Sequence, residues 1–535
     1  MSIVNFYKDQ EILVTGGTGF IGKVLIEKIL RSLPTISKLY VLIRAKKNKT
    51  AEERLKDLLE IPVFRRVHQE RPDALKKLIA ISGDCCEVGL GISAQDMQRL
   101  RNVSIIFHVA ATVRFDEDLK TSLLLNTRGA YEMVKLAQGL TNVKAFVHVS
   151  TTYAHPNITE LEEKIYPPYA DWRTMIKMAE TYDVETLNIL CRKIAPNHPN
   201  SYTFTKSLAE HIINDHRDKF PVVILRPSIV ISSYEEPIPG WIDNFNGPMG
   251  MLVACGTGIM RTSYSNPNIH PDIIAVDMCA KALIVAAFKL GTRTTKIPDD
   301  HLEIYNCCHS SKRHLTTGDI IDLGKKNILK VPFEKCIWLP EGSMTSCWLW
   351  HYYRFIISQI LPAIFFDSSL AMIYPPYADW RTMIKMAETY DFIISQILPA
   401  IFFDSLLAVA GQKPLFFRLH RRLESTTDIL KVFLNTEFSF LNDNFRALEN
   451  IIQKPERSTF NFLGYCDCDM EEYYLNATRG AKEFLLKEKP EPSKGAHLRM
   501  RIFRVLHYTI QFMGAFYIAR YLLRLLLGYV KSKTL

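Results

Sequence analysis

The stretch EILVTGGTGFIGKVLIEKIL at residues 11–30 decides the fold of this chain. Residues 11–15 are mostly apolar or β-branched and predict a buried strand, and an amphipathic helical pattern follows the glycines at once. In a dinucleotide-binding turn, glycines permit the tight bend, let the backbone approach a pyrophosphate and allow the helix to pack closely on the strand. Strand, turn and helix together predict such a site, whose residues are Gly16, Thr18, Gly19, Phe20, Ile21 and Gly22.

The same alternation of strand and helix patterns extends through the first part of the chain. Short apolar runs are separated by amphipathic stretches, and clear examples of these runs lie at 38–45, 103–111 and 144–152. Such alternation is typical of βαβ units and predicts an α/β fold with a Rossmann-type parallel sheet. The alternation stops near Asp319, so we predict a nucleotide-binding and catalytic domain over residues 1–315.

Composition and charge exclude several classes of protein. The 535 residues are 47% apolar and 23% charged, close to the globular average, so the chain is neither disordered nor collagen-like. The formal net charge is +10, but no basic stripe interleaved with aromatic residues is visible, so we expect no nucleic-acid partner and favour a membrane or an anionic small molecule. The eleven cysteines lack the paired spacing of a zinc site, so we expect no metal. The first residues show no basic region followed by an apolar run, so we expect no secretory signal.

The C-terminal part of the chain has a different organisation. Residues 335–486 read as a mostly helical domain, and a polar, charged linker at 487–496 precedes an apolar run at 502–530. As a helix that run is long enough for a bilayer core of about 30 Å, so we predict a membrane anchor. Arginines within the run leave open whether it spans the bilayer or lies in the interface, and the alternative is a buried core helix.

An internal repeat interrupts the helical region. IYPPYADWRTMIKMAETYD occurs at 165–183 and again, unchanged, at 373–391, and the segment at 355–371 recurs with one substitution at 392–408. Functional repeats diverge and stack in threes or more, and these copies do neither. We hypothesise that residues 372–408 are an aberrant duplicated insertion, from a recent duplication or a faulty gene model.

The second expected strand carries the signal for cofactor choice. It ends in Arg44, where an NAD-preferring site usually places an acidic residue about 20 residues after the glycines. A guanidinium matches phosphate geometry and can pair with a ribose 2′-phosphate, so the sequence favours NADPH. The alternative is a solvated basic loop, since Lys46 and Lys47 follow closely.

Tyrosine and lysine occur three times at the spacing YxxxK, and only context separates the copies. Residues i and i+4 share a helix face, so an ammonium can lower the pKa of the phenol and reach a nicotinamide ribose. Tyr202 and Lys206 follow the strand VHVSTT, whose Ser150, Thr151 or Thr152 could orient a substrate carbonyl. The copies at 131–135 and 529–533 are interpreted as helix surface and as part of the C-terminal tail.

These motifs resemble those of the fatty acyl-CoA reductases, the male-sterility type of extended short-chain dehydrogenase. The resemblance rests on TGGTGFIG, FHVAATVRFDE, VHVSTTYA, IYPPYADWRTMIKMAE and YTFTKSLAE, and it covers nearly the whole chain apart from the insertion. It implies that Tyr202 and Lys206 are the catalytic pair and that the glycines and Arg44 hold NADPH. Family members commonly have Ala at the position of Thr152, which favours Ser150 or Thr151 as the working hydroxyl. Further residues implied to lie along the cofactor are Asp84, Ala110, Ala111 and Pro227.

The resemblance also implies an activity, which is reduction of a long-chain fatty acyl-CoA to a primary alcohol through an aldehyde, with release of CoA. The competing interpretations are an extended short-chain dehydrogenase acting on a steroid or other lipid carbonyl, and a non-catalytic Rossmann protein acting as a membrane scaffold. We expect the endoplasmic reticulum membrane, with the catalytic domain facing the cytosol and the peroxisome as the alternative. Chain-length preference and oligomeric state cannot be read from the sequence.

Overall fold

The computed structural model of this protein describes most of the chain as two compact units. The described residues are 1–46, 48–196, 198–293, 302–309, 315–336, 338–355, 432–464 and 469–533. The first unit contains the described residues within Met1–Asn244, Asn268–Thr317 and Ser425–Gly480. The second contains those within Phe245–Pro267, Gly318–Glu424 and Ala481–Leu535. The insertion hypothesised at 372–408 lies outside the described residues.

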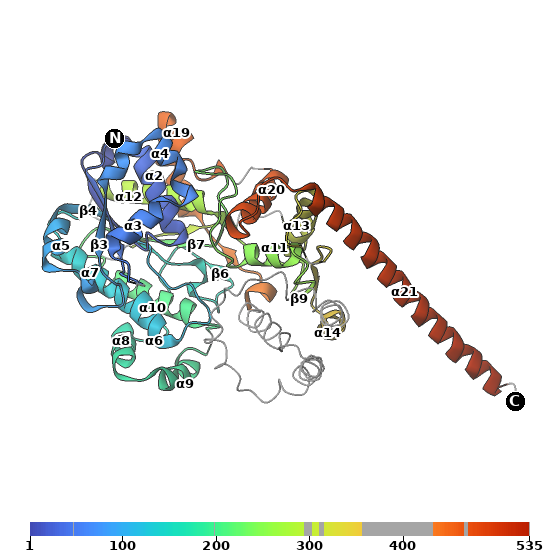
Figure 1. Ribbon diagram of the computed structural model, residues 1–535. Coiled ribbons are helices and arrows are strands. Elements are labelled where there is room, and N and C mark those ends of the chain that lie inside the picture. Colours follow the sequence, from blue (N-terminus) through green and yellow to red (C-terminus); the bar gives the residue numbers. More distant parts are fainter. Residues whose placement is uncertain are drawn as a thin grey trace. The chain divides into compact units, whose positions relative to one another are not determined.

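A seven-stranded parallel sheet forms the centre of the first unit, in the order β11-β7-β5-β4-β1-β2-β3 (Figure 1). Every neighbouring pair in this sheet runs parallel, which confirms the Rossmann-type sheet. Its strands read as continuous apolar runs because helices cover both faces of such a sheet. The strands are β1 (Glu11–Thr15), β2 (Lys38–Ile43), β3 (Leu78–Ser82), β4 (Val103–His108), β5 (Ala145–Val149), β7 (Val222–Pro227) and β11 (Glu303–Cys307).

Helices pack on this sheet in two layers. In one layer α2 packs on α12, and in the other α10 packs on α7. The second layer shares a buried core with the sheet, in which Met133 of α7 and Leu208 of α10 meet Phe146 of β5. The helices of this unit are α1 (Ile3–Tyr7), α2 (Phe20–Ser32), α3 (Ala51–Leu59), α4 (Arg65–Glu70), α5 (Ala94–Arg99), α6 (Leu119–Ser122), α7 (Gly129–Gly139), α8 (Trp172–Thr181), α9 (Val184–Ile194), α10 (Ser201–Asp215), α12 (Val276–Gly291), α18 (Asp443–Leu448), α19 (Arg457–Phe460) and α20 (Met470–Gly480).

Two small parallel sheets complete the first unit. Strand β8 (Ile229–Ile231) pairs with β10 (Ile273–Ala275), and β6 (Glu160–Leu161) pairs with β13 (Ser439–Phe440). Strand β13 brings a late segment of the chain to the Rossmann part, where Phe440 is buried with Leu161. The contiguous domains expected at 1–315 and 335–486 therefore do not coincide with the two compact units, because this burial is non-local in the sequence.

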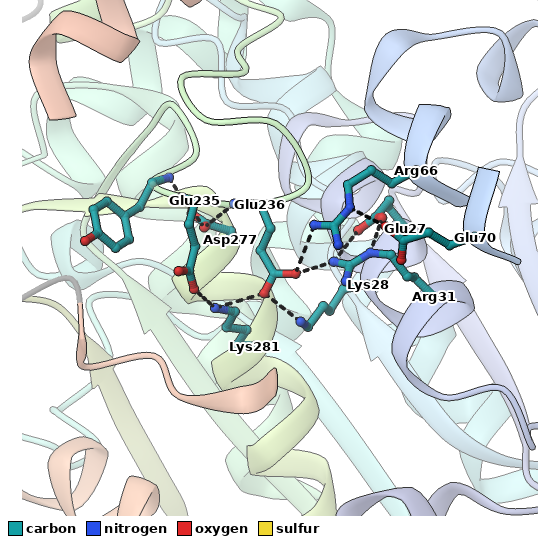
Figure 2. Close-up of polar contacts among 10 residues, drawn as sticks. Glu27, Lys28, Arg31, Arg66, Glu70, Glu235, Glu236, Asp277 and Lys281 are labelled. Carbon is teal, nitrogen blue, oxygen red and sulfur yellow. Dashed lines mark hydrogen bonds and ion pairs between the residues drawn. The ribbon is translucent and has the colours of Figure 1, made fainter. Parts of the chain in front are cut away.

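A buried ion network joins helices α2 and α12 to the loop that follows β8 (Figure 2). The carboxylate of Glu236 lies 2.7 Å from Lys28 Nζ and 3.0 Å from Lys281 Nζ. Asp277, at the start of α12, accepts hydrogen bonds from the backbone N–H groups of residues 234–236. Buried charges need such partners to offset their loss of hydration, so the network fixes the path of this loop.

The same loop continues over the start of α2. The ring of Trp241 stacks on Phe20, with centroids 5.4 Å apart, and Asp243 forms an ion pair with Lys23. Phe20 and Lys23 lie in the first turn of α2, directly after the glycine turn. The loop after β8 is therefore held against the turn in which the sequence predicts a dinucleotide.

The second unit contains short strands and four helices among its described residues. Strand β9 (Thr262–Tyr264) pairs with β12 (Ser343–Thr345). The helices are α11 (Pro248–Gly256), α13 (Thr317–Lys330), α14 (Trp348–Phe355) and α21 (Lys494–Lys533). Helix α21 has 40 residues and begins within the expected linker, where Ser493 Oγ accepts a hydrogen bond from Ala496 N. The linker therefore ends at residue 493 rather than 496. Within the part of the chain that the structure describes, no helix is both long and apolar enough to cross a membrane.

Candidate active site

The glycine turn after β1 fits a dinucleotide because its backbone is packed too closely for side chains. Gly16 has φ +71°, and a Cβ atom there would lie 2.6 Å from Ala110 N at the end of β4. A Cβ on Gly22 would lie 2.2 Å from the carbonyl oxygen of Gly16. Gly19 occupies the N-cap position of α2 and, having no side chain, accepts no hydrogen bond from the first N–H groups of the helix through a side chain. The first N–H groups of α2 therefore face a turn in which only Thr18 carries a side chain, an arrangement that suits a phosphate.

The remaining residues expected along the cofactor lie where the strands end. Arg44 follows β2 and Asp84 follows β3, and their side chains form an ion pair of 3.1 Å between Nη1 and Oδ2. Ala110 follows β4, and its N–H donates to Thr15 Oγ1 at 3.3 Å. Pro227 is the last residue of β7. Because the carboxyl ends of parallel strands meet at one edge of a sheet, the structure brings these residues to the edge at which such folds bind ligands.

The expected catalytic pair lies at the same edge. Asn200 caps α10 by accepting a hydrogen bond from Thr203 N, so Tyr202 and Lys206 are one turn apart near the start of the helix. The ammonium of Lys206 is buried and donates to the carbonyl oxygen of Val149 at 2.7 Å. Tyr202 is partly exposed, as a group that donates a proton to a substrate must be.

Burial shifts the acidity of both groups. It raises the pKa of Tyr202 to about 12, and a hydrogen bond with the Thr151 side chain opposes this only in part. It lowers the pKa of Lys206 to about 8, against the opposing charge of Glu210. The expected lowering of the Tyr202 pKa by the Lys206 ammonium is not among the causes of its shift, which are burial and the opposing Thr151 side chain. At neutral pH the phenol stays protonated and can donate its proton.

The structure distinguishes the three candidate hydroxyls beside β5. The Thr151 side chain acts on the phenol of Tyr202 and lowers its pKa, and its Oγ1 accepts from Tyr153 N at 3.2 Å and donates to the Pro227 carbonyl at 3.5 Å. The hydroxyls of Ser150 and Thr152 are buried and have no hydrogen-bond partner within the described ranges. The geometry therefore favours Thr151 as the hydroxyl that acts with the tyrosine.

The other two YxxxK pairs are placed differently. On α7 the ring of Tyr131 packs against Trp172 with centroids 5.0 Å apart, and Lys135 forms an ion pair with Glu132. This pair is ordinary helix surface. The pair at 529–533 lies in α21, where its side chains fall outside the described part of the chain.

Sequence reasoning did not single out a buried ion pair beneath the catalytic helix. Arg226 donates two hydrogen bonds to the carboxylate of Glu210, at 2.8 and 2.7 Å, and both side chains are at most 1% exposed. The guanidinium also donates to the carbonyl oxygens of Glu162 and Lys164. The signal was present, because Glu210 follows Lys206 by four residues and shares its helix face. The pair anchors the segment 162–164 below the catalytic residues.

A parallel Rossmann-type sheet, a glycine turn and a Tyr–Lys pair at its carboxyl edge define an NAD(P)-dependent oxidoreductase of the extended short-chain dehydrogenase class. Two sequence profiles, each described as "Male sterility protein", match residues 14–283 and 395–488. The chain belongs to the fatty acyl-CoA reductase family, which confirms the resemblance in its motifs and makes the protein an enzyme.

The relatives cover nearly the whole chain. It is 34% identical over 506 residues to Drosophila melanogaster "Fatty acyl-CoA reductase wat", covering 94% of this chain and 89% of the relative. It is 32% identical over 513 residues to Mus musculus "Fatty acyl-CoA reductase 1", covering 95% and 91%. A crystal structure of the reductase domain of a non-ribosomal peptide synthetase from Mycobacterium tuberculosis shares its fold, with a TM-score of 0.53, 18% identity and coverage of 91% of this chain and 95% of that one.

Proposed function

We propose that this enzyme reduces long-chain fatty acyl-CoA to a primary fatty alcohol, with NADPH as the reductant and CoA as the released thiol. The observation that carries the proposal is the meeting of Tyr202, Lys206 and Thr151 at the carboxyl edge of the sheet, at which the glycine turn also lies. A protonated phenol beside a second hydroxyl suits a carbonyl oxygen that gains negative charge. The family to which the chain belongs supplies the substrate class.

The choice of NADPH rests on Arg44. Its guanidinium is half exposed and lies next to Asp84, so it is held in place while it remains open to a phosphate. The glycine turn and the first turn of α2 would hold the pyrophosphate, and Ala110 and Ala111 would lie along the dinucleotide. When bound, the cofactor supplies the hydride, and reduction of a thioester to a primary alcohol needs two such additions.

The side chains of this enzyme then have distinct tasks. Tyr202 donates a hydrogen bond, and finally its proton, to the oxygen of the substrate carbonyl. Thr151 provides the second hydroxyl for that oxygen, next to the phenol whose pKa it lowers. Lys206 places a buried positive charge one helical turn from Tyr202, and this charge stabilises the negative charge that develops during the reaction. The first addition expels the CoA thiol and leaves an aldehyde, and the second uses the same hydroxyls to give the alcohol.

Membrane association is part of the proposal, and it rests on α21. Exposed apolar side chains recur along the helix, and cationic residues, including the exposed Arg501 and Arg504, lie among them. The exposed apolar residues are Leu498, Ile502, Val505, Leu506, Tyr508, Phe512 and Phe516. Long cationic side chains can reach the polar boundary of a bilayer while the apolar side chains around them contact lipid, and an acyl-CoA also partitions there.

The expected location is the endoplasmic reticulum membrane with the catalytic unit in the cytosol. Flotation of the full chain with phospholipid vesicles, with and without residues 494–533, tests the role of α21. Loss of flotation on truncation supports it, and equal flotation contradicts it. Labelled full-length protein in cells then distinguishes the endoplasmic reticulum from the peroxisome.

The reaction itself is tested by its stoichiometry. Purified full-length protein in detergent is given hexadecanoyl-CoA with NADPH or NADH, and oxidised cofactor, free thiol and alcohol are measured together. The proposal predicts two NADPH consumed for each thiol and each alcohol, and slower turnover with NADH. Reduction of a steroid carbonyl without thiol release would instead favour an alcohol dehydrogenase, and a folded protein that reduces neither would favour the scaffold.

A further inference from the structure

A connected set of aromatic rings runs from the catalytic tyrosine into the C-terminal part of the first unit. The ring of Phe115 lies beside Tyr202, with centroids 5.7 Å apart, and the ring of Phe433 lies 5.8 Å from that of Phe115. Tyr153 meets Phe433 edge to face at 5.2 Å. The four rings come from four separate segments of the chain, so their meeting beside one hydroxyl is a property of the folded unit.

The rings nearest Tyr202 differ in exposure from those behind them. Phe115 and Phe433 are partly exposed, whereas Phe438 and Phe440 are at most 5% exposed and pack against Tyr153. The buried pair therefore gives the set its support. The partly exposed pair leaves apolar surface next to the catalytic hydroxyl. Exposing this surface to water costs free energy, and an apolar ligand that covers it removes this cost.

From this geometry we infer that Phe115 and Phe433 form the surface on which the first methylenes of the acyl chain lie, and so decide how much bulk is accepted next to the reacting carbonyl. The inference rests on the proposed function. A carbonyl held by Tyr202 has its alkyl chain attached one bond away, so the first carbons of that chain must lie among the groups that flank the phenol. Phe115 is such a group, and Phe433 continues its surface.

The two rings also connect the two parts of the sequence that define the family. Phe115 lies in the segment matched by the first profile, and Phe433 lies in the segment matched by the second. Strand β13 holds the second segment in the first unit through its pairing with β6. The late segment thus supplies a specificity residue to a catalytic site that the Rossmann part builds.

The competing explanation is that Phe433 only packs the C-terminal segment against the Rossmann part. Phe462 provides a matched control, because it lies in the same late segment and packs against Phe445 with centroids 4.9 Å apart. Its ring is 1% exposed and is therefore fully committed to packing. A purely structural role predicts that changes at Phe433 and at Phe462 act alike.

The test compares hexadecanoyl-CoA with 2-methylhexadecanoyl-CoA in full-length wild type, Phe433→Ala, Phe433→Leu and Phe462→Leu. We expect the ratio of kcat/KM for the branched over the straight substrate to rise about tenfold in Phe433→Ala, because one methylene in a fitted apolar site changes kcat/KM by about tenfold or more. The ratio should rise less in Phe433→Leu and should not change in Phe462→Leu. Because Phe433 is partly exposed, both substitutions should fold. A ratio that stays within about twofold of wild type in both Phe433 variants, or an equal rise in Phe462→Leu, overturns the inference.

A binding measurement separates this inference from the proposed function. S-hexadecyl-CoA is a thioether that cannot be reduced, and its Kd is measured for the same proteins, with free CoA as the second ligand. The inference predicts weaker binding of the thioether, but not of CoA, in Phe433→Ala. If the wild type turns over no acyl-CoA but shows this binding pattern, the proposed reductase activity is wrong while the inferred acyl-binding surface stands. Equal Kd values for the thioether in wild type and Phe433→Ala contradict the surface whether or not the enzyme is active.

Discussion

Two buried polar regions of the first unit differ in how completely their groups are paired. In the ion network between α2 and α12, Glu236 contacts Lys28, Arg31 and Lys281 together, and these cations hold its pKa well below the ordinary value against the effect of burial (Figure 2). At the carboxyl edge around Tyr202, burial outweighs the opposing influences on both catalytic groups, as it also does on Lys28 of the network. There burial raises the pKa of the phenol and lowers that of the lysine.

The edge also holds polar atoms that the protein does not pair. Both ring nitrogens of His148 lack hydrogen-bond partners among the residues described. Buried polar groups are normally paired, so unpaired ones mark a place where a ligand or a catalytic task accounts for the cost. The ion network therefore stabilises the fold, whereas the residues at the carboxyl edge serve catalysis.

The largest expected effect comes from removing the buried cation of the edge. Lys206→Met keeps a long apolar stem, and the ammonium it removes donates its hydrogen bond to the Val149 carbonyl rather than to a carboxylate. We expect kcat to fall by about 100- to 10,000-fold, with no loss of thermal stability, because the charge acts on the reaction rather than on folding. Alcohol formation and Tm are measured on the same preparation, and a large fall in Tm would place Lys206 in the scaffold instead.

We expect the matched substitution in the ion network to lower stability and to leave activity nearly unchanged. Lys281 is as deeply buried as Lys206, but it pairs with Glu235 and Glu236. Lys281→Met deprives those carboxylates of this cation, so we expect a loss of about 3–5 kcal/mol in the free energy of unfolding. Activity per folded molecule should stay near wild type at a temperature well below Tm. Denaturant unfolding measures the first quantity, and unchanged stability would show that the network is not needed for folding.

Substitutions at the two candidate hydroxyl residues should have smaller effects on kcat, and the two effects should differ from each other. Thr151→Val removes the hydroxyl that lowers the pKa of Tyr202, and we expect kcat to fall by about 10- to 100-fold. Ser150→Ala removes a hydroxyl without a partner in the described ranges, and we expect kcat within about twofold of wild type. Steady-state rates with hexadecanoyl-CoA decide the matter. If the serine variant is the slower one, Ser150 is the working hydroxyl.

The weakest effect is a pH dependence that comes from Lys206. Its pKa in the folded protein is about 8, so the ammonium is present below that pH and is lost as the pH rises through it. The rate of the reductive step should therefore be level below about pH 8 and decline above it. Lys206→Arg should keep its charge to higher pH and shift the decline upward. A profile that stays flat to about pH 10 would show that the ammonium is not required.

Local patterns in the sequence are sufficient to predict the sheet and most of the site. The glycine turn is specified by neighbouring residues, and Tyr202 and Lys206 are joined by helical spacing, so both follow from the sequence alone. The preference for Thr151 over Ser150 does not, because it depends on which way each side chain leaves the strand end. The raised pKa of Tyr202 escapes prediction for a similar reason, since burial is produced by segments distant in the sequence.

The position of the late segment, residues 432–440, also could not be predicted from local sequence patterns. Residues around Phe433 and Phe440 carry a helical and apolar pattern, which gives no sign that they reach the Rossmann part. Their place is set by the pairing of β13 with β6 and by ring contacts with Tyr153, across more than half of the chain. Non-local burial of this kind has no signature in a local window, so the contiguous domain boundaries could not anticipate it.

The most direct test of the account is Tyr202→Phe, compared with Tyr131→Phe as the control from another YxxxK pair. Both proteins are assayed for fatty alcohol and aldehyde from hexadecanoyl-CoA, and their Tm values are measured alongside. The account predicts that Tyr202→Phe is folded, binds NADPH and makes neither product, while Tyr131→Phe keeps its activity. Alcohol formation by Tyr202→Phe at the wild-type rate would contradict the assignment of this edge as the active site.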